Sequence, residues 1–279
     1  MLKLNFVPVR TFVAATVFAI SSIWSVAPAQ ASGDLLVAPT RIIFDGRRGT
    51  QVILNNVGAE ESTYRISLVL RRMGPNGKLA EVKPEEANEK ENGALGVIRY
   101  APRRVTLPPN QPQAIRLGLR GTEDLGDGEY RAHLLFRAIP KTPAATEAVA
   151  QATGLKIQLI PVYGITIPLI IRKGKLQATA AITNPHLVTD PRGQILAFDL
   201  ARQGNKSVYG EIRVTRQGES EPAMVAKGIA VYPELETRKV FLPLAPKQAA
   251  SLKGPVKIGY YETLEAGGGL IAEVQTVLR

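Results

Sequence analysis

The chain has 279 residues, a formal net charge of +11 and no cysteine. Without cysteine, disulfides and thiolate metal sites are excluded, so the folded product depends on core packing. Its basic residues stand singly or in pairs among apolar segments, without a basic helix or an aromatic-basic ribbon, so we expect no nucleic acid as a partner. A basic surface of this kind suits a partner that is acidic or carries a free carboxylate.

The first 31 residues have the pattern of a secretory signal peptide. Lys3 and Arg10 form a basic start, residues 11–20 are a short apolar core, and Ala29-Gln30-Ala31 fits a signal peptidase. The alternative is a membrane anchor, but the apolar core is shorter than the about 20 residues that a membrane span needs. We therefore expect cleavage after Ala31 and no stable membrane insertion. The predicted mature chain, Ser32–Arg279, is exported and retains +9 of the net charge.

Alternating apolar and polar residues predict β-structure in the first half of the mature chain. Pro, Gly and Asn interrupt the alternation every 8–12 residues or so, which is typical of β-sandwiches. The polar segment between Gly74 and Gly96 predicts a loop with room for one short strand. The strands expected before residue 140 are Leu35–Phe44, Thr50–Asn55, Thr63–Met73, Arg103–Leu107, Gln113–Leu119 and Glu129–Ile139.

The longest β-run of the sequence is Leu155–Arg172, in which the odd-numbered positions are almost all apolar. Such a stripe lies on one face of a strand. Pro161 and Pro168 cannot donate to a ladder, which favours an edge strand or a broken strand. Lys173-Gly174-Lys175 then predicts a hinge between domains.

The second half repeats the β-pattern with other residues. The fold class expected for the whole chain is all-β, with two immunoglobulin-like β-sandwich domains joined by a short hinge. The first domain would comprise residues 32–172 and the second residues 173–279. The strands expected in the second domain are Leu176–Thr183, Gln194–Arg202, Tyr209–Thr215, Ala223–Tyr232, Arg238–Leu242, Val256–Thr263 and Leu270–Leu278.

Several segments of the first half of the sequence match, in this order, the motifs of one known protein family. A Thr-Arg pair precedes a Phe-Asp-Gly turn, a proline followed by Leu-Pro-Pro precedes an Ile-Arg-Leu strand, and a later strand ends in Ile-Pro. The matching segments are Pro39–Gly46, Tyr100–Arg103, Leu107–Pro109, Ile115–Leu117, Tyr130–Pro140 and Leu155–Arg172. Together they resemble the periplasmic chaperones that assemble pili. The resemblance covers most of Leu35–Arg172, whereas the second half matches only in general character.

The resemblance implies a function by donor-strand complementation in the periplasm. Leu155, Ile157 and Leu159 would lie in the apolar groove of a pilus subunit that lacks its last strand. Arg41 matches an arginine that binds the C-terminal carboxylate of the subunit, a role that suits the guanidinium fork. The expected partners are pilus or fimbrial subunits and an outer-membrane usher.

One feature of that family has no counterpart in the sequence. The family carries a lysine late in the donor strand, on the face opposite the apolar stripe. The candidates on that face here are Gly164, Thr166 and Pro168, none of which is basic. Three alternatives stay open: Arg41 acts alone, another basic residue substitutes, or the chain is a divergent branch.

An alternative without a partner also stays open, namely a structural or adhesive sandwich protein of the cell envelope whose stripe at Leu155–Leu159 is ordinary core. An enzyme is not expected, because no nucleophile, acid or base constellation is visible. His133 and His186 are isolated and lack the spacing of metal ligands. We expect no metal site and no cofactor.

Overall fold

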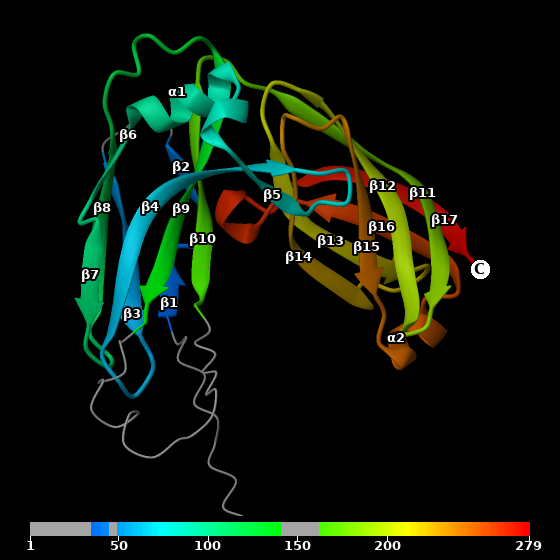
Figure 1. Ribbon diagram of the computed structural model, residues 1–279. Helices are drawn as coiled ribbons and strands as arrows, with labels where there is room; N and C mark the ends of the chain where they lie inside the picture. Colours follow the sequence, from blue (N-terminus) through cyan, green and yellow to red (C-terminus); the bar gives the residue numbers. More distant parts are fainter. Residues whose placement is uncertain (1–34, 45–48, 141–161) are drawn as a thin grey trace, which may run out of the picture. The chain divides into compact units, whose positions relative to one another are not determined.

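Ten strands of the first half form two sheets that pack face to face (Figure 1). The computed structural model describes residues 35–44, 49–140 and 162–279. The strands are β1 (Leu35–Ala38), β2 (Ile42–Phe44), β3 (Thr50–Asn56), β4 (Ser62–Met73), β5 (Leu79–Val82), β6 (Ile98–Ala101), β7 (Arg104–Leu107), β8 (Pro112–Leu119), β9 (Gly128–Ile139) and β10 (Gly164–Lys173).

The strand order of this first sandwich is that of an immunoglobulin-like fold. One sheet has the order β1-β3-β8-β6, and the other has the order β2-β10-β9-β4-β5, with β7 also pairing with β4. These orders correspond to the A-B-E-D and A′-G-F-C arrangements of immunoglobulin domains. The predicted fold class is thereby confirmed for this half of the chain.

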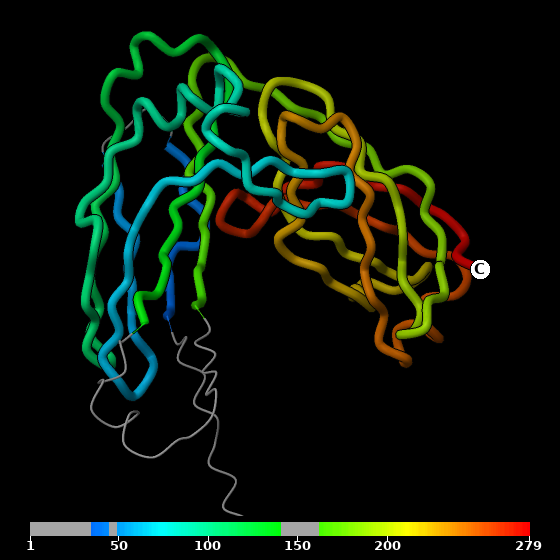
Figure 2. The backbone as a smooth tube through the Cα atoms, in the orientation of Figure 1, coloured from blue at the N-terminus to red at the C-terminus, as the bar shows by residue number. Residues whose placement is uncertain are grey.

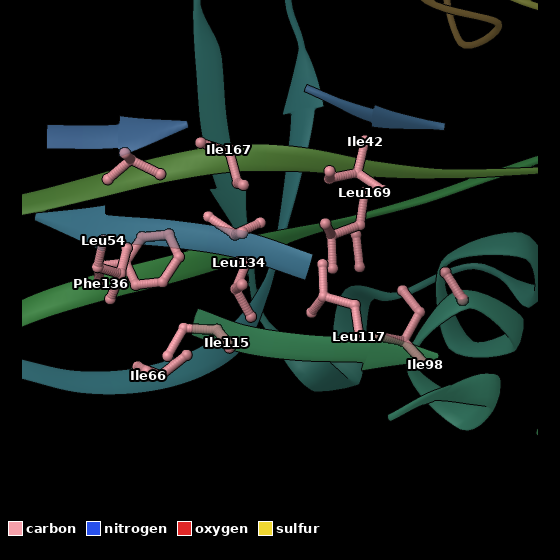
Figure 3. Packing of buried hydrophobic residues seen from close by; sticks show 14 of the residues in the cluster. Ile42, Leu54, Ile66, Ile98, Ile115, Leu117, Leu134, Phe136, Ile167 and Leu169 are labelled. Atoms are coloured by element: carbon pink, nitrogen blue, oxygen red, sulfur yellow. The ribbon is translucent and has the colours of Figure 1, made fainter. Parts of the chain in front are cut away.

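The core of the first sandwich lies between these two sheets (Figure 3). Alternate residues of each strand point inward, such as Leu134 and Phe136 on β9, Ile167 and Leu169 on β10 and Ile115 on β8, and all are 0–2% exposed. Burying each of these side chains contributes roughly 1.5–3 kcal/mol. The apolar alternation therefore fixes which face of each strand points outward, and the candidate site lies on the outward face of the β10 sheet.

The predicted strand Leu35–Phe44 is in fact two strands that belong to different sheets. β1 pairs with β3, whereas β2 pairs in parallel with β10. The break falls at Pro39, whose ring cannot donate a ladder hydrogen bond. Residues on both sides reach the same core, because Val37 and Ile42 are buried.

The segment predicted as a loop between Gly74 and Gly96 contains the expected short strand and also a helix that the pattern did not predict. β5 forms a hairpin with β4, followed by the short 3-10 turn Pro84–Glu86 and by α1 (Glu89–Val97). The Asn88 side chain accepts a hydrogen bond from the N–H of Glu91, whose carboxylate accepts from the N–H of Asn88. This capping box stabilises a short helix that contains two glycines.

Seven strands of the second half form a second sandwich (Figure 2). Its sheets have the orders β11-β12-β15 and β14-β13-β16-β17. The predicted strands are confirmed within a few residues, except that β11 continues seven residues beyond the predicted Thr183. The elements are β11 (Ala178–Asp190), β12 (Gly193–Gly204), β13 (Val208–Arg216), β14 (Met224–Val231), β15 (Thr237–Pro243), α2 (Pro246–Ser251), β16 (Gly254–Tyr261), the 3-10 turn Leu264–Ala266 and β17 (Leu270–Leu278).

Residues 33–279 form one compact unit in which the two sandwiches share contacts. Met73 and Ile170 form a small buried cluster with Ala230 and Tyr232. The tip of the β4–β5 hairpin also reaches β15, where the N–H of Lys239 donates to the carbonyl of Pro75 at 2.7 Å. Among the described residues, no helix has the length and apolar character needed to cross a membrane.

Candidate partner-binding site

Arg41, the arginine singled out from the sequence, lies between β1 and β2 and is held by residues of the second sandwich. Its guanidinium carbon lies 4.3 Å from the ring centroid of Tyr209. Its Nη1 donates to the Tyr232 hydroxyl at 3.3 Å, and its Nη2 donates to Ser207 Oγ at 3.4 Å. Aromatic faces and hydroxyls hold a guanidinium in place without neutralising its charge. Arg41 is thus positioned, but it has no carboxylate partner among the described residues.

A second arginine meets Arg41 at the same serine. Arg172, near the end of β10, donates from Nη2 to Ser207 Oγ at 3.4 Å and from Nε to Glu129 at 3.0 Å. Ser207 in turn donates to Glu129 from its Oγ at 2.9 Å and from its backbone N–H at 3.1 Å. Two guanidinium groups and one carboxylate therefore surround Ser207, which leaves one positive charge uncompensated at this point.

Both arginines line a pocket of about 940 Å³, which we call the arginine pocket. Ser207 and Tyr209 line it beside them, and the acids Glu211, Glu262 and Glu265 line it as well. An anion that reached Ser207 could accept from both guanidinium groups, since both already donate to one oxygen. Charge-assisted hydrogen bonds of this kind are about twice as strong as neutral ones. The pocket has the chemistry of a carboxylate site.

Arg172 was not singled out from the sequence, although it lies on the same face of β10 as Gly164, Thr166 and Pro168. Residues two apart on a strand share a face, so Arg172 is the next basic residue on the face where the lysine is missing. The pairing of Leu169 with Ile42 brings β2, and Arg41 before it, next to this strand. The sequence alone did not predict this parallel pairing between distant segments.

The histidine on this outward face is buried and uncharged. His133 lies on β9 opposite Pro168 and is 1% exposed, with no hydrogen-bond partner for either ring nitrogen among the described residues. Burial, together with the positive charges of Arg131, Arg71 and Arg41, lowers the pKa of His133 to about 3. The residue therefore adds no charge to the arginine pocket near neutral pH.

This low pKa makes the stability of the protein depend on pH. An unfolded histidine has a pKa near 6.5, so the unfolded chain takes up a proton that the folded chain refuses. The contribution of neutral His133 is complete above pH 6.5 and is lost as the pH falls from 6.5 toward 3. At pH 5 the loss is about 2 kcal/mol.

The His133→Leu variant should lose less stability than the wild type between pH 7 and pH 5 in urea unfolding. His186→Leu is the matched control, because it makes the same substitution at an exposed histidine. Equal slopes for all three proteins would contradict the pKa shift.

β10 has an open edge beside the arginine pocket. It pairs with β9 over Gly164–Lys173 but with β2 only over Leu169–Ile171. Among the described residues, no strand pairs with Gly164–Pro168 on the side away from β9. The Tyr163 carbonyl accepts from the N–H of Ala138, so backbone groups of odd-numbered residues face β9 and those of Gly164 and Thr166 face the open edge.

The predicted donor residues Leu155, Ile157 and Leu159 lie outside the described residues, so their role stays a prediction. The described part of the same run belongs to β10, in which the odd-numbered residues Ile165, Ile167, Leu169 and Ile171 pack in the core of the first sandwich. Within the described residues, no group of three or more His, Asp or Glu side chains could hold a metal ion.

The sequence matches no protein-family model and no curated protein. Among solved structures, the chain is similar to the YadV chaperone, with a TM-score of 0.45, 13% identity, and coverage of 88% of this chain and 100% of the other. The chain is also similar to the CupB2 chaperone of Pseudomonas aeruginosa, with a TM-score of 0.43 and 15% identity. The match covers 87% of this chain and 100% of the other.

A chain from the CsuC–CsuE chaperone–tip adhesion subunit pre-assembly complex of the archaic chaperone–usher Csu pili of Acinetobacter baumannii is also similar. It gives a TM-score of 0.41 at 14% identity and covers 88% of this chain and 97% of that one. We base the functional proposal on the residues of the present chain.

Proposed function

We propose that this protein is a periplasmic chaperone that binds pilus or fimbrial subunits by adding a strand to them and by holding their C-terminal carboxylate. After signal cleavage it would meet subunits in the periplasm and deliver them to an outer-membrane usher. The observation that carries the proposal is the open edge of β10, which ends beside Arg41. This edge continues the run in which the donor residues Leu155, Ile157 and Leu159 are predicted.

The geometry of the edge favours a partner strand of one direction. β2 runs parallel to β10, and Ile42 at its start pairs with Leu169. A strand added beside Gly164–Pro168 in the same direction would lie in line with β2, and its C-terminus would meet Arg41. Backbone hydrogen bonds would supply affinity, and the open edge would be covered. A subunit that lacks its last strand needs such a strand to complete its own sheet.

The arginine pocket is suited to the carboxylate that such a strand would bring. Arg41 and Arg172 both donate to Ser207 Oγ, and Glu129 neutralises only one of the two charges. The carboxylate of the partner would supply the missing negative charge. In this proposal Arg172 takes the place of the lysine that the sequence lacks, so the anchor consists of two arginines.

Arg41→Ala should weaken capture of the exported subunit encoded beside its gene by about 30-fold. This is near the lower end of the 2–5 kcal/mol that loss of a desolvated charge partner costs, because Arg172 remains. Folding should be little affected, since the guanidinium makes two long hydrogen bonds to hydroxyls and a contact with the Tyr209 ring but forms no ion pair among the described residues. The measurement is the dissociation constant of the purified complex by calorimetry, together with the thermal midpoint of the free variant.

Arg116→Ala serves as the control, because Arg116 is an exposed arginine on β8, in the other sheet of the sandwich. Wild-type affinity for the Arg41→Ala variant would refute the carboxylate anchor. Extending the C-terminus of the subunit by two glycines should weaken its binding to the wild-type protein. The same extension should weaken its binding to Arg41→Ala only slightly further.

A further inference from the structure

Three arginines form a row across adjacent strands on the outward face of the β10 sheet. Arg65 on β4 lies directly opposite Arg104 on β7 and directly opposite Arg137 on β9. Arg137 lies opposite Gly164, where the open edge of β10 begins. We call these three residues the arginine row.

The arginine row is exposed and carries no compensating charge. All three side chains are exposed, and none has a hydrogen bond or an ion pair within the described part of the chain. Of the residues of β2, β4, β7, β9 and β10 that point outward, Glu129 is the only acid, and it is paired with Arg172. Like charges directly opposite each other destabilise a sheet. Stabilisation of the fold therefore does not explain why three arginines lie together here.

The face on which the row lies is the one that a partner on the open edge would cover. Arg41 precedes Ile42, which pairs with Leu169, so it stands about four residues along β10 from Gly164. This corresponds to about 13 Å along the strand. Thr63, Thr106 and Ile139 surround the row with small or half-buried side chains. A protein bound at β10 and Arg41 would thus have its body over the row.

We propose that the arginine row is a second contact surface, which binds an acidic surface of the captured protein. This inference rests on the proposed function and adds the chemistry of the partner: Asp and Glu side chains on the part of the subunit that covers β9, β4 and β7. Opposite charges steer encounter and fix orientation. An anionic membrane is a poorer match, because lipid-binding clusters usually hold about 4–8 basic residues.

The test uses a short peptide of alternating Glu and Thr with an amidated C-terminus, which keeps the carboxylate site out of the measurement. Binding is followed by fluorescence anisotropy at about 0.1 M salt, where the Debye length is about 10 Å and the effect of arginines on the other sheet is screened. The triple variant Arg65→Gln, Arg104→Gln and Arg137→Gln should bind about tenfold more weakly than wild type. A peptide of alternating Gln and Thr should bind neither protein.

The matched control replaces Arg99, Arg116 and Arg120 by Gln, which removes the same net charge from exposed arginines around β6 and β8. It should bind the acidic peptide like wild type. Equal losses of peptide affinity in both triple variants would show that the effect comes from net charge alone and would overturn the proposal. The proposal would also be overturned if the wild type bound anionic phospholipid vesicles but not the peptide, and if the row variant lost the binding to vesicles.

A folding defect would be recognised separately, because removing like charges should leave the thermal midpoint unchanged or raise it. Weakened peptide binding by the row variant, together with weakened subunit capture by Arg41→Ala, would support both contact surfaces. If the row variant binds the acidic peptide like wild type while subunit capture still depends on Arg41, the row proposal is wrong and only the carboxylate anchor remains.

Discussion

Replacing Glu129 by alanine is expected to lower the free energy of unfolding by about 3–5 kcal/mol. Glu129 is 4% exposed and accepts hydrogen bonds from Arg172 and from both the N–H and the Oγ of Ser207. Its removal would leave the Arg172 guanidinium without its carboxylate and the Ser207 N–H without a partner. Because Ser207 belongs to the second sandwich, the loss falls on the contact between the two sandwiches.

Urea unfolding at neutral pH measures this change. Glu219→Ala is the matched control, since Glu219 pairs with Arg216 at the surface, where both side chains are more than 40% exposed. Such pairs contribute about 0–1 kcal/mol. A loss of that small size for Glu129→Ala would show that Arg172 is satisfied without the carboxylate. The placement of both arginines around Ser207 would then need revision.

The sequence predicted the strands well where alternation and burial agree. β17 matches its predicted range, and β3, β8 and β9 differ by one residue at an end. The failures have local physical reasons. α1 is short and contains two glycines, so the only sequence signal was the capping box of Asn88 and Glu91. The division of Leu35–Phe44 between two sheets follows from long-range pairing, which alternation alone does not encode.

The candidate site shows the same limit. Arg41 could be identified because its neighbours resemble a known first strand. Arg172 could not, because nothing in its own segment shows that Ser207 and Glu129 lie beside it. Glu129, Arg172 and Ser207 are 35 to 78 positions apart in the sequence and come from three strands or loops. The arginine row is likewise visible only from the register of β7, β4 and β9.

Ile157→Asp is expected to abolish the complex with the subunit while leaving the free protein folded. In the proposed function, Ile157 fills the apolar groove of the partner, and an aspartate there would be a buried charge without a counterion. Burying such a group costs several kcal/mol, enough to cancel ordinary binding. If Ile157 belonged instead to the core of this chain, the same cost would approach the stability of a whole domain.

The most direct test of strand donation is therefore one pair of readings on purified Ile157→Asp: its thermal midpoint, and its co-purification with the subunit encoded beside its gene. Lys156→Asp is the matched control, because it introduces the same residue one position away, on the opposite face of the strand. Donation predicts a midpoint within a few degrees of wild type and loss of the complex only for Ile157→Asp. A collapsed midpoint for Ile157→Asp would place Ile157 in the core of this chain and contradict strand donation at this segment.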